Sequence, residues 1–151
     1  MRVALVTGGG SGIGRSAALE LNKIDFTVYV VGRREEELIK TSSLATNNNH
    51  KIIPIKTDIT IGSQVIALFD KIKSDHGRID LLFNNAGMGA PRVPIEDLKE
   101  EDWRKTVDVN LTGSFLCSQQ AIKLMKKQSP QGGRIVNNGS VSAHSPRPDT
   151  I

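Results

Sequence analysis

The sequence predicts an α/β protein, a Rossmann-type doubly wound parallel sheet covered by helices on both faces in three layers. Two observations carry this prediction. Five short runs of strand-forming residues alternate with segments of helical periodicity, and a glycine-rich or polar segment follows each run. Strands that alternate with helices require a parallel sheet with right-handed crossovers. Ligands bind such sheets at the carboxyl ends of the strands, where these polar residues are expected to gather.

Composition limits the protein to one ordinary domain, residues 1–151, expected in the cytoplasm. With 24% charged and 38% hydrophobic residues, the chain is typical of neither disordered nor membrane proteins. The N-terminus lacks the layout of a signal peptide. The single cysteine, Cys117, suits a reducing compartment and is expected to be a small buried residue. The net charge of +4 comes from scattered cations, so nucleic acid is not an expected partner.

The strands are predicted from continuous apolar runs, as expected where both faces of a sheet are covered. The order in the sheet should be 3-2-1-4-5, with the glycine loop at the switch between the first and fourth strands. The expected strands are residues 2–6, 26–31, 51–56, 79–83 and 134–138.

The helices are predicted from apolar residues at helical spacing. In the first helix the expected apolar stripe is Ile13, Ala17, Ala18 and Leu21. The third helix should end at Gly77. The helices are expected to end at Asn22 and to cover residues 35–45, 61–76 and, with one interruption, 96–127.

A glycine loop follows the first strand and opens the first helix. Strand, glycine turn and helix in this order are the context in which such a loop indicates dinucleotide binding. Gly8 would allow the tight turn, Gly12 a close approach to the pyrophosphate, and Gly14 close packing of the helix. Free N–H groups and the helix dipole would face the phosphates. The predicted cofactor contacts in this loop are Thr7, Gly8, Gly10, Ser11, Gly12, Ile13 and Gly14.

Gly32, Arg33 and Arg34 follow the second strand, where NAD enzymes place an acidic residue on the ribose. A carboxylate there would repel a 2′-phosphate, whereas glycine followed by two arginines would attract one. NADP is therefore favoured over NAD, although Ser11 supplies no second cation in the glycine loop. The alternative is that both arginines are solvent-exposed residues at the start of the next helix, with no ligand.

Five motifs together resemble the short-chain dehydrogenases/reductases, in the compact branch with TGxxxGxG spacing. They are TGGGSGIG at 7–14, Asp58, NNAG at 84–87, VNLTG at 109–113 and GRIVNNGS at 133–140. The resemblance implies an adenine-side contact from Asp58, with Ile59 beside it, and a ribose lining from Asn85, Ala86 and Gly87. It also implies that Asn110 and Ser140 belong to the catalytic tetrad.

The chemistry of these two residues fits such a role. The Ser140 hydroxyl can polarise a carbonyl or alcohol oxygen, and a mid-helix Asn110 could expose its backbone carbonyl to a proton-relaying water. Without the resemblance, they would be interpreted as a turn residue and a helix defect.

The family's catalytic Tyr and Lys should follow Ser140 by roughly a dozen positions, beyond Ile151. The one tyrosine, Tyr29, lies inside the second predicted strand and is expected to be core packing. We therefore expect a partial sequence that lacks the last strands and is inactive by itself. Its fifth strand and the helix around 108–127 would expose apolar surface and favour association.

The parent protein is predicted to be an NADP-dependent oxidoreductase that interconverts a carbonyl and an alcohol on a small molecule, as a homo-oligomer. The alternative is a non-catalytic nucleotide-binding or regulatory protein of this length.

Several other residues are interpreted as having no catalytic or metal-binding role. A Ser140–His144 nucleophile pair lacks an acid to orient the histidine. His50 and His76 have no second ligand at metal spacing and are expected to be solvated. Trp103 and Leu98, at helical spacing with Val107, are predicted to lie in the core.

Overall fold

The computed structural model describes residues 1–145 and 147–149. Its sheet has five parallel strands in the order β3-β2-β1-β4-β5, which confirms the predicted order. The chain therefore reverses direction across the sheet between β1 and β4, as expected for a switch point. The strands are β1 (Arg2–Thr7), β2 (Phe26–Gly32), β3 (Ile52–Lys56), β4 (Leu81–Asn84) and β5 (Arg134–Asn137).

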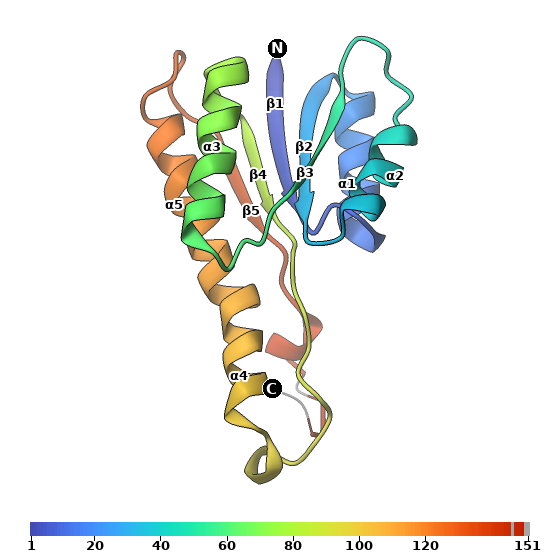
Figure 1. Ribbon diagram of the computed structural model, residues 1–151, viewed down its shortest axis with the longest axis vertical. Helices are drawn as coiled ribbons and strands as arrows, with labels where there is room; N and C mark the ends of the chain where they lie inside the picture. The colour runs from blue at the N-terminus through green and yellow to red at the C-terminus, as the bar shows by residue number, and fades with distance from the viewer. Residues whose placement is uncertain (146, 150–151) are drawn as a thin grey trace.

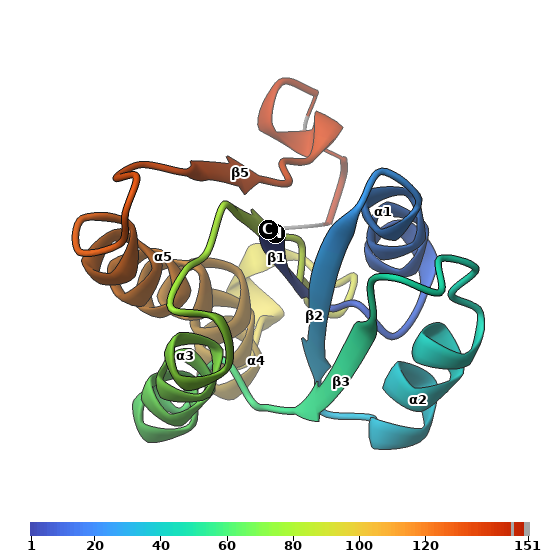
Figure 2. The same cartoon turned by 90° about the horizontal axis from the view of Figure 1, so that it is seen from above.

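Helices cover both faces of this sheet in three layers, as predicted (Figures 1 and 2). The first pair, α1 (Gly12–Lys23) and α2 (Glu35–Ser43), lies on one face. On the other face lie α3 (Gly62–His76) and α5 (Gly113–Met125). A further helix, α4 (Glu100–Val107), leads into α5 through a π turn over Asp108–Thr112 and extends beyond the end of the sheet (Figure 1).

The side chains of β1 show why the sheet needs both layers. Val3 and Leu5 belong to the core cluster that includes residues of α3 and α5, whereas Ala4 and Val6 belong to the cluster that includes residues of α1 and α2. All four are fully buried. The alternation of a strand thus sends successive apolar residues into two separate cores, which makes the run continuous in sequence.

The fourth strand begins two residues later than the apolar run predicts. The Gln128 carboxamide accepts from the Ile79 N–H at 2.8 Å and donates to the Ile79 carbonyl at 3.0 Å. Ile79 is buried, but both its backbone groups are satisfied by this side chain from beyond α5, so strand pairing with β1 starts at Leu81. The predicted end of the third helix is confirmed, because Gly77 caps α3 with a positive φ of 69°.

Four predictions of burial were wrong. Ile13 is 63% exposed because it lies in the first turn of α1; Gly14, Ala18 and Asn22 are that helix's buried residues. Trp103 is 51% exposed because α4 extends past the sheet (Figure 1). His76 is half-buried rather than solvated, and its ring meets the Tyr29 ring edge-on with 5.8 Å between centroids.

His50 is also partly shielded. Its side chain is 19% exposed, and its Nε2 lies 4.0 Å from the Asp25 Oδ1. The prediction that it is solvated is therefore wrong. The polar segment before β3 is bonded to the end of α1, because the Asn22 carboxamide donates to the His50 carbonyl at 2.9 Å and the Asn47 carboxamide donates to the Asn22 carbonyl at 2.9 Å.

Apolar side chains remain exposed where the sequence indicates an uncovered surface. Leu111 is 68%, Phe115 58% and Ile122 44% exposed, all on or beside α5. Val136 on the edge strand β5 is 40% exposed. Cys117, by contrast, is fully buried, and burial raises the pKa of its thiol to about 12. None of the helices in the described part of the chain has the length and apolar character needed to cross a bilayer.

Candidate functional site

The glycine loop after β1 has backbone geometry that side chains would obstruct. Gly8 and Gly12 have φ values of +65° and +53°, in the region that favours glycine. A Cβ on Gly14 would lie 2.3 Å from the Gly8 carbonyl oxygen. A Cβ on Gly12 would meet nothing within 4 Å, so the backbone there is open on its outer side. The loop is therefore tight against the helix at Gly14 and open at Gly12.

Thr7 joins this loop to the segment that follows β4. Its side chain oxygen accepts from the N–H groups of Asn85 and Ala86, both at 2.9 Å. The Asn85 carboxamide returns a hydrogen bond to the Thr7 carbonyl at 3.0 Å. Thr7 is only 1% exposed, so its bonds connect the ends of β1 and β4 within the protein interior.

A cavity of about 310 Å³ follows the carboxyl ends of β1, β2, β3 and β4. Most of the predicted cofactor contacts line it: Gly8, Gly10, Ser11, Gly32, Arg33, Arg34, Asp58, Ile59, Asn85, Ala86 and Gly87. Thr7, Gly12, Ile13 and Gly14 line neither this cavity nor the one described below. Thr7 and Gly14 are instead buried beneath the loop and determine its shape, Thr7 through its hydrogen bonds and Gly14 through its close contact with Gly8.

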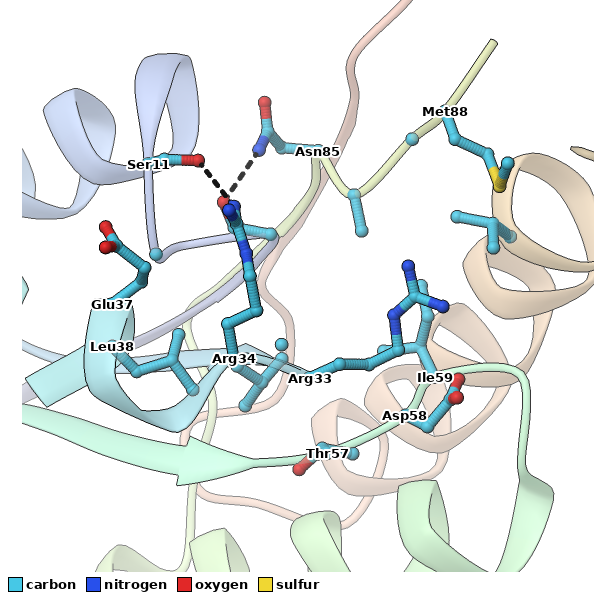
Figure 3. A pocket seen from close by; sticks show the side chains of 17 residues that line it. Ser11, Arg33, Arg34, Glu37, Leu38, Thr57, Asp58, Ile59, Asn85 and Met88 are labelled. Carbon is cyan, nitrogen blue, oxygen red and sulfur yellow. Dashed lines mark hydrogen bonds between the residues drawn. The ribbon is translucent and has the colours of Figure 1, made fainter. Parts of the chain in front are cut away.

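The two arginines after β2 diverge within this cavity (Figure 3). Arg34 points toward the glycine loop, where its Nη2 donates to the Ser11 Oγ at 3.2 Å. Arg33 points toward the side where Asp58 and Ile59 lie. Ser11 brings no charge of its own, but it positions the Arg34 guanidinium, so two cations reach the cavity from one strand end.

Asp58 is fixed at the far end of the cavity by its own turn. Its Oδ1 accepts from the Thr60 hydroxyl at 2.7 Å and from the Thr60 N–H at 3.0 Å. Its N–H donates to the Gln64 Oε1 at 2.8 Å. These bonds hold Asp58, two residues past the end of β3, in place without a bond to Arg33, which lines the same cavity.

Sequence reasoning missed several residues that line this cavity. Apolar side chains from three elements and from the loop after β4 contribute to it: Val31, Leu38, Val109 and Met88. It also missed Glu37, which lies in the first turn of α2, three residues after the N-cap residue Arg34. Because the backbone of Arg34 is extended and precedes the helix, helical spacing could not place these two side chains together.

A second cavity of about 630 Å³ adjoins the first and shares residues 85–88 with it. Asn110 and Ser140 both line it, although thirty positions separate them in sequence. Ser114 and Ser118 also line it and were missed. They follow Asn110 at intervals of four, which was the signal that all three share a helix face.

Asn110 lies in the π turn between α4 and α5. Its carboxamide makes two bonds to the backbone of Met88, accepting from the N–H at 2.9 Å and donating to the carbonyl at 2.8 Å. Its own backbone carbonyl accepts from the Ser114 hydroxyl at 3.0 Å. The side chain therefore holds the segment that both cavities share, and the π turn changes the regular bonding of the helix at its carbonyl.

Ser140 is exposed just after β5, at the start of a short turn over Val141–Ala143. Its Oγ accepts from the Ser142 N–H at 3.1 Å, which leaves the hydroxyl hydrogen available as a donor. Two residues earlier, the Asn138 carboxamide donates to the Asn85 Oδ1 at 3.1 Å. The end of β5 is thus tied to the segment after β4.

Comparisons with known proteins agree on one family. A family model described as short chain dehydrogenase matches residues 2–151. The chain is 37% identical over 141 residues to a 3beta-hydroxysteroid dehydrogenase of Mediterraneibacter gnavus, covering 93% of this chain and 50% of that protein. It is 34% identical over 140 residues to a cis-4-hydroxycyclohexanecarboxylate dehydrogenase of Sinomonas cyclohexanicum, covering 93% of this chain and 55% of that protein. The chain therefore spans about half the length of these curated relatives.

Solved structures give the same result. A NAD+-bound xylitol dehydrogenase is similar with a TM-score of 0.91 and 30% identity, over 98% of this chain and 56% of the other. A metagenomic short-chain oxidoreductase in complex with NADP is similar with a TM-score of 0.91 and 27% identity, over 99% of this chain and 66% of the other.

Proposed function

Because this chain belongs to the short-chain dehydrogenase family, we propose that it supplies the cofactor-binding part of an oxidoreductase that uses NADP(H) to interconvert a carbonyl and an alcohol. One observation carries the proposal. Two adjoining cavities share residues 85–88; the first holds the arginines, and the second is lined by both Asn110 and Ser140. The two adjoining cavities together form one groove. The adenosine half of a dinucleotide would occupy the first cavity, and its nicotinamide half would reach the second, beside the substrate.

The glycine loop supports a dinucleotide in this groove. The open backbone at Gly12 leaves room for a pyrophosphate at the N-terminus of α1, where unpaired N–H groups and the helix dipole favour an anion. Asp58 would accept from the adenine side, and Asn85, Ala86 and Gly87 would line a ribose. When bound, the nicotinamide supplies a hydride donor or acceptor.

The charges around the first cavity favour NADP(H) over NAD(H). Related structures are named with either cofactor, so the family alone does not decide between them. Here no acidic residue stands at Gly32, and Arg33 and Arg34 both line the cavity. A 2′-phosphate carries up to two negative charges and matches guanidinium donors in geometry.

In the second cavity the substrate would be a small carbonyl or alcohol compound. Ser140 would donate its hydroxyl hydrogen to the substrate oxygen, which polarises the carbon–oxygen bond. Asn110 would hold the backbone of Met88 and offer its carbonyl to a proton-relaying water. Tyr29 has no such role, because its buried hydroxyl donates to Asp75 at 2.6 Å and this burial raises the pKa of the phenol.

Replacement of Arg33 by alanine tests the cofactor proposal. Arg33→Ala is expected to weaken NADP(H) binding by about 1–3 kcal/mol, the usual contribution of a charged hydrogen bond, and to leave NAD(H) binding nearly unchanged. Fluorescence titration with both reduced cofactors measures the two effects. Arg104→Ala, on the remote helix α4, is the matched control for the loss of a surface cation. Equal weakening of both cofactors by Arg33→Ala would show that this arginine does not read the phosphate.

We also propose that a second copy of this chain covers the exposed face at Leu111, Phe115 and Ile122, beside the opening of the second cavity that Leu111 and Phe115 also line. Light scattering after size-exclusion chromatography is expected to show dimers or larger species. Phe115→Glu should shift the chain toward monomer, because it places a charge in the apolar contact. A monodisperse wild-type monomer would contradict this.

A further inference from the structure

A cluster of side chains around Arg15 connects the glycine loop to α2. The Arg15 Nε donates to the Thr41 Oγ1 at 3.0 Å, and its Nη2 donates to the carbonyl of Gly10. The Thr41 hydroxyl donates to the Gly9 carbonyl at 2.9 Å. Thr41 is fully buried, so the floor of the glycine loop and the body of α2 are held together by these groups.

The same guanidinium pairs with Glu37. The Arg15 Nη2 lies 2.6 Å from the Glu37 Oε2, and the side chains are 20% and 36% exposed. The hydrogen bond from Arg15 lowers the pKa of Glu37, so the carboxylate is ionised at neutral pH. Glu37 is thus a fixed negative charge on a wall of the first cavity, beside Arg34 (Figure 3).

Without a cationic partner, the Glu37 carboxylate would lower the affinity of the first cavity for NADP(H), which the two arginines favour. It would repel a 2′-phosphate, and it would compete with the phosphate for the Arg34 guanidinium, which lines the same cavity. Arg15 does not line the cavity but neutralises that carboxylate from behind. We propose that Arg15 is a positioning residue for cofactor choice: by pairing with Glu37 it keeps the first cavity selective for ligands with a 2′-phosphate. This inference rests on the proposed NADP(H) preference.

The test compares two small probes that differ only in the 2′-phosphate, adenosine 2′,5′-bisphosphate and adenosine 5′-phosphate. The measured quantity is the ratio of their dissociation constants, by calorimetric titration of the 151-residue chain. Arg15→Gln leaves one uncompensated negative charge and is expected to reduce the selectivity for the 2′-phosphate about tenfold at low salt. Glu37→Gln leaves one uncompensated positive charge and is expected to raise the selectivity severalfold. The double variant restores the wild-type ratio.

Matched controls change the same charges far from the cavity. Arg104 and Glu100 form a similar pair on α4, with side chains 71% and 74% exposed. Arg104→Gln and Glu100→Gln alter the net charge by the same amounts and are expected to leave the ratio unchanged. Thermal melting of each variant shows whether it is folded.

The outcomes separate a role in selectivity from a role in structure alone. If Arg15 were only a structural clamp, Arg15→Gln would weaken both probes equally, and adding Glu37→Gln would restore nothing; that result overturns the inference. If Arg15→Gln does not fold, Glu37→Gln still decides, because unchanged or reduced selectivity there also overturns it. A wild-type chain that does not distinguish the probes would refute the NADP(H) preference itself, and the inference with it. A selective wild type with unresponsive variants would refute the inference alone.

Discussion

Gly14→Ala is expected to lower the free energy of unfolding by about 3 kcal/mol and to abolish dinucleotide binding. The added Cβ would lie 2.3 Å from the Gly8 oxygen and 2.6 Å from the Asn85 Nδ2. Neither neighbour can move freely. Gly8 sits in a positive-φ turn whose own Cβ position is 2.9 Å from the Ala86 backbone, and Asn85 is bonded to Thr7. The substitution must therefore push α1 away from the loop.

Urea unfolding measures the stability, and cofactor fluorescence measures the binding. Gly89→Ala is the matched control, since a Cβ there meets nothing within 4 Å; a change within about 0.5 kcal/mol is expected. Wild-type stability and binding in Gly14→Ala would show that the loop is not packed as described.

The 151-residue chain is expected to bind NADPH without reducing ketones at a measurable rate. The family's chemistry needs a proton donor beside the substrate oxygen, and positioned general acids contribute about 10²–10⁴-fold. The one tyrosine in these residues, Tyr29, is fully buried in β2 and donates to Asp75 on α3. Ser140 can polarise a carbonyl, but its hydroxyl has a far higher pKa than a phenol and cannot readily protonate the product alkoxide.

The loss of NADPH absorbance with a panel of ketones measures this expectation. Ser140→Ala provides the control, because background activity from a contaminant is unaffected by it. Clear turnover that disappears in Ser140→Ala would contradict the expectation and would show that the second cavity contains a sufficient proton donor.

Much of the fold could be predicted because local signals and the global topology agree. The alternation of strands and helices predicted the order of the strands in the sheet, and the glycine loop predicted the position of the switch point. The start of β4 could not be predicted, because Gln128, almost fifty positions away, takes the backbone groups of Ile79. Trp103 shows another limit. Helical spacing predicts which residues share a face, but not whether any element packs against that face.

In the candidate site, too, some residues could be predicted from local sequence signals and others depend on how the elements pack. Residues at strand ends, such as Arg33 and Asp58, could be found because every strand end in a parallel sheet meets the same edge. Asn110 and Ser140 could be paired only through the family resemblance, and the structure places both beside one cavity. Arg15 could not be found in this way. It lies one residue past the glycine loop, and its contacts with Glu37 and Thr41 depend on how α1 and α2 pack against each other.

The central claim is that this groove binds a dinucleotide and recognises its 2′-phosphate through the arginines after β2. Titration of the wild-type chain with NADPH and NADH under identical low-salt conditions tests it most directly. We predict that NADPH binds at least about tenfold more tightly, as expected for one or more charged hydrogen bonds, and that added salt narrows the difference. Equal affinities for the two cofactors, or tighter binding of NADH, would contradict the claim.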